Sequence, residues 1–392
     1  MMKSCISGVK LLLAILCFAL APAVAYGASA IVDCSGATPP PAFTTITAAL
    51  ATLPAAGPNS ISVKGTCTET VSIIRRTDLT IFGNPTATVQ SVNPNARLLV
   101  VFDSQRISIQ GITFSGSRGV LVNDNSRVNF DTITIQNSGN VGLTSFDSHV
   151  HLFNSSIING ARSGININGG TFDVDGGVTV SGNARSGIVA SIARLRLNGG
   201  DGTPGTENVI SNNTGSGVSI ANSATAEIGG DNRITNNGGA YGLIVIHTSN
   251  LIMSEGTISN NTGIGVHCGE TSHCEWSGGT QINGNGGGGI EITDHSDGYI
   301  DGGITISGNT GTGVLVDLSS LLNSLGGNTV NNNTGDGIEV NNLSVLKFAG
   351  IDTVTGNADR SLECDNESLV VGDISSLRNV RCSRNHLAKK AK

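Results

Sequence analysis

Short runs of alternating apolar and polar residues recur along most of this chain, and each run follows a turn rich in asparagine and glycine. Three clear copies read Asn-Asn-Thr-Gly-x-Gly and end at Gly217, Gly265 and Gly337. The residue after each final glycine starts an alternation of period two, which is typical of a β-strand. Such a unit, repeated at a fixed spacing, predicts a solenoid of strands.

The glycine that closes each turn serves as the anchor of its copy. Successive anchors lie 22 to 25 residues apart, with one interval of 30. The long interval holds an insertion at residues 199–208, which we expect to protrude as a loop. The anchors are Gly119, Gly142, Gly164, Gly187, Gly217, Gly242, Gly265, Gly289, Gly313 and Gly337.

Each copy contains three short alternations. After Gly265, the alternate positions Val266, Cys268, Cys274 and Trp276 are predicted to face inward. A third alternation precedes the next turn. Three strands per repeat, each stacked on its equivalent in the next repeat, predict an all-β fold: a parallel β-helix of roughly a dozen coils.

An asparagine four residues before the anchor recurs in most copies. Asparagines stacked coil upon coil can bond the backbone of the turns, so we expect an inward ladder with a structural role. The glycines that follow are expected to supply positive φ. The ladder positions are Asn183, Asn213, Asn261, Asn285, Asn309, Asn333 and Asn357.

The ends differ from the middle. Residues 44–53 form a short amphipathic pattern that Pro54 ends, which predicts a helix covering the first coil. We therefore divide the chain into a signal peptide at 1–30, an N-terminal cap at 31–60, coils at 61–360, and a C-terminal cap and tail at 361–392.

The first 30 residues have the pattern of an export signal. Lys3 and Lys10 lie before an apolar run at residues 11–25. Two candidate cleavage sites with the small-x-small pattern end at Ala25 and Ala30. We expect an exported protein, in the periplasm, at the cell surface or outside the cell, with no membrane anchor after the signal is removed. We also expect a monomer and no nucleic-acid partner.

Charge is uneven along the chain. The whole sequence has 22 basic and 29 acidic residues, so 20 basic residues remain after the signal. Residues 201–359 hold 16 acids and only Arg233 and Lys347 as bases, whereas residues 75–196 hold ten arginines and seven aspartates. Most surfaces of this kind are simply solvated.

Six cysteines lie after the predicted signal, and an even number in an exported chain favours disulfides. Pairing sequence neighbours is one of fifteen arrangements, and it would close both ends of the solenoid. That pairing is Cys34 with Cys67, Cys268 with Cys274, and Cys364 with Cys382.

With its asparagine column and its opening of a helix followed by strands, the chain resembles the right-handed parallel β-helix repeat proteins, the superfamily of pectate lyases and polygalacturonases. The resemblance covers nearly all of the chain after the signal. It does not extend to catalytic signatures: the chain has Asn-Thr-Gly where polygalacturonases have Asn-Thr-Asp. It also lacks their Asp-Asp, Gly-His-Gly and Arg-Ile-Lys motifs, and the Asp-Pro-His of alginate epimerases.

The resemblance implies that substrate lies along the outer face of the strand after the long turn. On that face we expect His151, Asp173 and Arg196 at one height on consecutive coils, about 4.8 Å apart. Asp173 or His151 could move a proton while Arg196 binds a substrate carboxylate. Further substrate-binding residues are predicted at His149, Arg194, Arg162 and Arg185. A charge ladder that keeps the sheet soluble is the alternative interpretation.

A second cluster lies three and four coils beyond the coil of Arg196. It contains His267 opposite Glu291 and His273 opposite Asp297. Histidine and carboxylates can bind a divalent ion, so His273, Asp297 and Glu275 form a candidate metal site, for Ca²⁺ if any cofactor is used.

Two classes of function remain open. The chain could be an exported protein that binds or processes an acidic polysaccharide, as a lyase or a glycoside hydrolase if it is an enzyme. It could instead be a non-catalytic surface or matrix protein. The missing signatures favour the second class, and the histidine, aspartate and arginine face favours the first.

Overall fold

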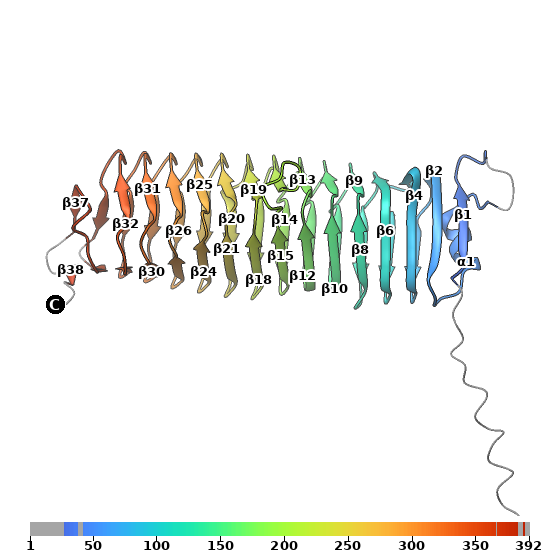
Figure 1. Cartoon of the computed structure of the whole chain (residues 1–392), viewed down its shortest axis with the longest axis horizontal. Helices are drawn as coiled ribbons and strands as arrows, with labels where there is room; N and C mark the ends of the chain where they lie inside the picture. The colour runs from blue at the N-terminus through green and yellow to red at the C-terminus, as the bar shows by residue number, and fades with distance from the viewer. Residues whose placement is uncertain (1–26, 38–41, 366, 383–386, 389–392) are drawn as a thin grey trace, which may run out of the picture.

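Short parallel strands wind around one long axis in about 13 turns (Figure 1). The computed structural model describes residues 27–37, 42–365, 367–382 and 387–388. Most of the predicted signal peptide, residues 1–26, lies outside the described residues. Pairing between the named strands is parallel and links each coil to the next, as the repeat predicts.

Each regular coil contributes one strand to each of three faces, which we name A, B and C in chain order after the anchor glycine. Face A consists of β3 (Val71–Ile74), β5 (Leu99–Phe102), β7 (Val120–Asn123), β14 (Ile188–Ser191), β17 (Val218–Ala221), β20 (Tyr241–Val245), β23 (Ile264–Cys268), β26 (Ile290–Ile292), β29 (Val314–Val316), β32 (Ile338–Val340), β35 (Leu362–Cys364) and β37 (Val380–Arg381).

Face B follows face A around a tight corner. It consists of β1 (Ser29–Asp33), β8 (Arg127–Asp131), β15 (Arg194–Asn198), β18 (Thr225–Gly229), β21 (Asn250–Ser254), β24 (His273–Ser277), β27 (Asp297–Ile300), β30 (Leu321–Ser324), β33 (Val345–Phe348), β36 (Leu369–Val371) and β38 (Leu387–Ala388).

Face C completes the coil before the asparagine turn. It consists of β9 (Thr134–Gln136), β11 (Ser156–Ile158), β13 (Thr179–Ser181), β16 (Asn208–Ser211), β19 (Asn232–Thr235), β22 (Thr257–Ser259), β25 (Gln281–Asn283), β28 (Thr305–Ser307), β31 (Thr329–Asn331) and β34 (Thr353–Thr355). Five longer strands bend from one face to the next: β2 (Asn59–Thr68), β4 (Thr77–Gln90), β6 (Gln105–Ser115), β10 (Leu143–Phe153) and β12 (Ile165–Asp175).

The predicted inward positions form the core. Val266, Cys268, Cys274 and Trp276 are all fully buried, and they pair in register with Ile290, Ile292, Gly298 and Ile300 of the next coil. Because the side-chain period of a strand is two, the residues between them must face outward on faces A and B. The repeat therefore fixes which side chains are available to a ligand.

The asparagine ladder is confirmed. Asn261 Nδ2 donates to Asn285 Oδ1 at 3.0 Å, and Asn285 Nδ2 donates to Asn309 Oδ1 at 3.0 Å. The ladder also includes Asn237, which the count from the anchor missed because that turn holds one extra residue.

The prediction that the glycines after the ladder asparagines supply positive φ is wrong. Among the ten anchors, all within the described residues, only Gly119 has positive φ. The anchors are instead needed for close packing, since a Cβ at Gly289 would lie 2.5 Å from the carbonyl oxygen of Gly313 in the next coil. Positive φ falls on the residue before each ladder asparagine, such as Asn260 or Gly308. Asparagine tolerates this conformation better than most residues, which explains the Asn-Asn pairs.

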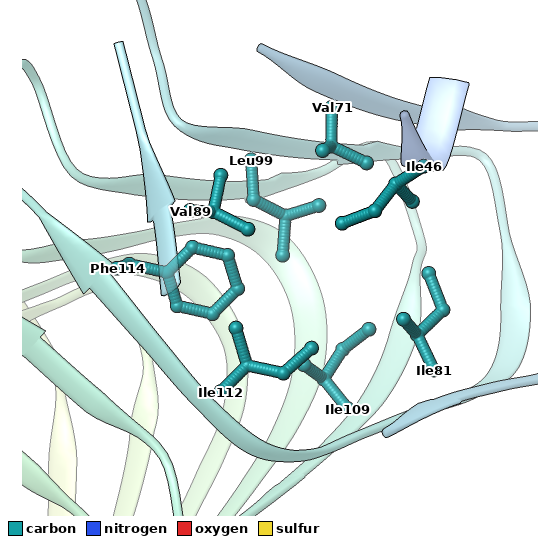
Figure 2. A pocket seen from close by; sticks show the side chains of 8 residues that line it. All are labelled: Ile46, Val71, Ile81, Val89, Leu99, Ile109, Ile112 and Phe114. Atoms are coloured by element: carbon teal, nitrogen blue, oxygen red, sulfur yellow. The ribbon is translucent and has the colours of Figure 1, made fainter. Parts of the chain in front are cut away.

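The predicted cap helix is present as α1 (Ile46–Thr52), slightly shorter than residues 44–53. Its apolar side meets the first coils, and Figure 2 shows Ile46 pointing into the same apolar space as Val71, Leu99 and Phe114. Strand β1 adds a rung before the predicted coils, because Ala30 pairs with Ile61. The described solenoid thus begins inside the segment that we predicted as the end of the signal peptide.

All three predicted disulfides are present: Cys34 with Cys67, Cys268 with Cys274, and Cys364 with Cys382. The first and last lie in the terminal coils, and the middle one lies inside the core. No helix in the described part of the chain is long and apolar enough to cross a membrane.

Candidate functional site on face B

The outward side chains of face B stack in columns, as the sequence predicts. His151 pairs in register with Asp173, Asp173 with Arg196, and Arg196 with Glu227. The strands that carry them are β10, β12, β15 and β18. The three predicted catalytic residues therefore occupy one height on consecutive coils.

The side chains do not pair along that column as expected. Asp173 lies 3.5 Å from Nε2 of His149 and 3.9 Å from Nη1 of Arg196. His151 leans away instead, and its Nε2 lies 2.5 Å from Asp175. The carboxylate between an imidazole and a guanidinium is thus confirmed, but its imidazole belongs to His149, which we had expected only to bind substrate.

Asp173 is the least exposed member of this group, with 15% of its side chain accessible. Its Oδ1 atom has no hydrogen-bond partner within the described residues and lies buried beneath the neighbouring side chains. A buried carboxylate oxygen is normally satisfied by a donor, so this enclosed and unpaired oxygen sets Asp173 apart from the other carboxylates of the row.

The surroundings of His149 favour its neutral form. Burial lowers its pKa below the ordinary value; the Asp173 carboxylate opposes this, while Arg127, His151 and Arg196 lower it further. The imidazole is therefore neutral at neutral pH and able to accept a proton.

Glu227 binds both predicted cationic groups. Nη2 of Arg194 lies 2.6 Å from its carboxylate, and Nε of Arg196 lies 3.1 Å away. The hydrogen bond from Arg194 lowers the pKa of Glu227; burial opposes it and Arg196 adds to it. Both arginines are predicted from the sequence, whereas Glu227 is not predicted as their shared partner.

The other two predicted binding arginines lie elsewhere. Arg162 and Arg185 are exposed in the turns between faces C and A, at the same position of adjacent coils. They do not belong to face B, so they are not part of this group.

The candidate metal site at His273, Asp297 and Glu275 stays a prediction. Nδ1 of His273 lies 2.6 Å from Asp297, and the ligand atoms of the three residues do not all lie within 4.8 Å of one another. Among the described residues, one group of three potential ligand atoms lies within 4.8 Å of one another, namely Cys34, Cys67 and Glu69. Its cysteines are joined in a disulfide, so that group does not offer thiolates to a metal.

A family model described as a right handed beta helix region matches residues 194–371. The fold is therefore a right-handed parallel β-helix. The match covers the most regular coils, and the strands before residue 194 continue the same winding.

Solved structures share this β-helix fold. The periplasmic alginate epimerase AlgG is 14% identical, with a TM-score of 0.53 over 76% of this chain and 77% of that one. The A-module of mannuronan C-5 epimerase AlgE4 from Azotobacter vinelandii is 14% identical, with a TM-score of 0.50 over 80% and 91%. At this identity the likeness shows the fold. Among curated proteins, none matches the chain significantly.

Proposed function

We propose that this β-helix protein is exported and binds an acidic polysaccharide along face B, centred on Asp173. The observation that carries the proposal is the position of Asp173 between a neutral imidazole and a guanidinium on a flat, solvent-facing row. The fold supports it, because the similar structures named above are polysaccharide epimerases. The three disulfides support export, since such bonds persist in oxidising compartments.

The roles follow from the contacts. Arg194 and Arg196 present guanidinium groups that can bind a sugar carboxylate in two-point fashion, exchanging it for Glu227. Oδ2 of Asp173 lies 3.5 Å from Nε2 of His149 and holds that imidazole in place. If the bound sugar is also transformed, His149 is the residue that accepts the proton, because burial keeps it neutral.

One observation favours a purely structural role. His149, His151, Arg194 and Arg196 each pair with a carboxylate of a neighbouring coil, so the row is already satisfied without a ligand. Charge pairs of this kind keep an exposed sheet soluble and in register. A non-catalytic surface or matrix protein is therefore the second candidate.

Binding measurements distinguish polysaccharide binding from a purely structural role. Titration calorimetry with polyuronates such as alginate, and with a neutral glucan, tests the wild type, Asp173→Asn and the double variant Arg194→Gln/Arg196→Gln. Lys347→Gln is the matched control, because Lys347 lies outward on face B seven coils beyond Asp173. We expect polyuronate binding that both test variants weaken at least tenfold and the control preserves. Absence of polyuronate binding by the wild type would leave the structural role, and equal binding by all variants would place the ligand on another face.

A further inference from the structure

Among the described residues, five histidines pair with a carboxylate of the next coil, and the pair between His267 and Glu291 differs from the other four. Its imidazole is the most enclosed, with 11% of the side chain exposed against 33–53% for the others. It lies on face A rather than on the candidate face B. Nδ1 of His267 lies 2.8 Å from Oε2 of Glu291.

The imidazole is held on two further sides. The ring of Tyr241, from β20 in the preceding coil, stacks on it with centroids 4.6 Å apart and planes 27° apart. On the other side the chain has Gly269, where a Cβ would come within 2.5 Å of Nε2. A bulkier residue at 269 would thus displace the ring.

Two polar atoms of this group are left without partners. Neither Nε2 of His267 nor the hydroxyl of Tyr241 has a hydrogen-bond partner within the described residues. Neither atom is fully buried. Both atoms therefore keep some contact with solvent. Burial, Glu291 and Asp294 raise the pKa of Tyr241, so its hydroxyl keeps its proton.

The three groups have complementary roles in ester hydrolysis. A carboxylate that holds Nδ1 orients the imidazole and stabilises its protonated form, which leaves Nε2 to activate water. A protonated phenol beside it can donate to the oxygen that becomes negative in the transition state.

The surroundings argue against other chemistry. The coils that surround the group are formed by residues 201–359. The only arginine and lysine in this range are Arg233 and Lys347, and they lie on faces C and B. A uronate would find no cation on this part of face A, and the many carboxylates would repel it. The position next to Glu291 in register is Leu315, so face A places no second carboxylate directly beside Glu291 in the next coil.

We propose that Tyr241, His267 and Glu291 form a second site, on face A, which hydrolyses acyl esters carried by a neutral glycan; the glycan part rests on the proposed function. Nε2 of His267 takes a proton from water while the water oxygen bonds to the acyl carbon and the carbonyl electron pair moves onto its oxygen, held by the Tyr241 hydroxyl. The pair then returns, the bond from the acyl carbon to the sugar oxygen breaks, and the imidazolium gives its proton to that oxygen. The products are a carboxylic acid and a free sugar hydroxyl.

The experiment follows p-nitrophenyl acetate hydrolysis and acetate release from an O-acetylated neutral glycan. His267→Gln, Tyr241→Phe and Glu291→Gln are compared with His247→Gln, which removes an exposed histidine of the same pairing type. We expect His267→Gln to lower kcat at least about 100-fold, and Tyr241→Phe, which keeps the ring stack, to lower kcat about 100-fold with little change in KM. His247→Gln should match the wild type, and the wild-type rate should fall in D₂O.

The outcomes are distinct. A wild-type rate no higher than that of His267→Gln, with all variants folded by circular dichroism, overturns the site. Hydrolysis of the small ester without release of acetate from the glycan overturns the assignment of the substrate. Loss of polyuronate binding on face B leaves the small-ester result untouched, so failure of the proposed function and failure of this site are measured separately.

Discussion

One asparagine side chain joins three coils in this solenoid. Nδ2 of Asn309 donates to the carbonyl of Ile282 and to Oδ1 of Asn333, while its Oδ1 accepts from the backbone and side-chain nitrogens of Asn285. The side chain is fully buried, so water cannot replace these partners. A polar column inside an apolar core is stable here because each amide is satisfied by the coil above and the coil below.

Replacing Asn309 by alanine should lower the free energy of unfolding by about 1–3 kcal/mol, because buried partners are left unsatisfied. Asn250→Ala is the control, since Asn250 is exposed on face B and its side chain makes no contact that the ladder needs. Chemical denaturation of both variants measures the difference. Equal stability of Asn309→Ala and wild type would mean that the turn finds other partners.

For single residues, the sequence predicted the position of a side chain better than the side chain that it contacts. The asparagine column followed from spacing alone, and only Asn237 was missed, where an extra turn residue shifted the count. On face B the register of His151, Asp173 and Arg196 was also correct. The partner of Asp173 was not, because a side chain can lean along its strand to a diagonal neighbour, and the pleat does not specify that direction.

Charged side chains from the first coils bind both ends of the cap helix. The carboxylate of Glu69 accepts from the backbone nitrogens of Ile46 and Thr47 at the helix start, and Arg76 donates to the carbonyls of Leu50 and Leu53 at its end. Each charge complements the helix dipole at its terminus. The helix and its stop at Pro54 could be predicted from local sequence. These two partners could not, since they lie 22 to 26 residues away and meet the helix only once the coils have formed.

Arg76→Ala should therefore destabilise the fold by about 1–3 kcal/mol, because the carbonyls at the end of the helix lose a charged donor. Arg75→Ala is the matched control: Arg75 is exposed and pairs only with Asp103 across the surface. Thermal and denaturant melts compare the two. If both variants melted alike, the helix would be held by its apolar contacts with Val71 and Leu99 rather than by Arg76.

The ion-paired side chains of face B predict how the free energy of unfolding changes as the pH falls. The pKa of Glu227 is lowered in the folded protein, so its contribution is present above the unfolded value of about 4.5 and is lost as pH falls through the folded value. The pKa of His149 is also lowered, so the unfolded state binds more protons as pH falls below about 6.5, and stability declines there too.

Melting temperatures measured from pH 8 to pH 3 test both steps. His149→Asn should remove the part of the decline that begins near pH 6.5, and Glu227→Gln should reduce the part below about pH 4.5. Other carboxylates titrate in the lower range, so the informative quantity is the difference from wild type at each pH. A His149→Asn profile parallel to that of the wild type would show that this imidazole does not titrate with folding.

The molecule as a whole is a stack in which the strands of each coil pair with those of the adjacent coils. The interval of 22 to 25 residues predicted this architecture, because a constant repeat with period-two runs admits few other folds. Function is harder to predict, since outward residues are free to vary without changing the stack. The Tyr241, His267 and Glu291 group illustrates this: opposition of His267 and Glu291 was visible in the repeat, whereas the stacking tyrosine comes from the preceding coil.

Because stability in such a stack is local, the terminal disulfides should protect the ends more than the middle. Cys34 and Cys67 close a segment of 33 residues, whereas Cys268 and Cys274 close one of 6 within a continuous core. In the chain-entropy account, the double variant Cys34→Ser/Cys67→Ser should cost about 3–4 kcal/mol and Cys268→Ser/Cys274→Ser about 2 kcal/mol. Hydrogen exchange should show faster exchange in α1 and the strands from β1 to β4 in the first variant, with β17 to β26 unchanged. Uniformly faster exchange along the whole chain would instead mean that the coils unfold as one cooperative unit, and that the end bond stabilises all of them.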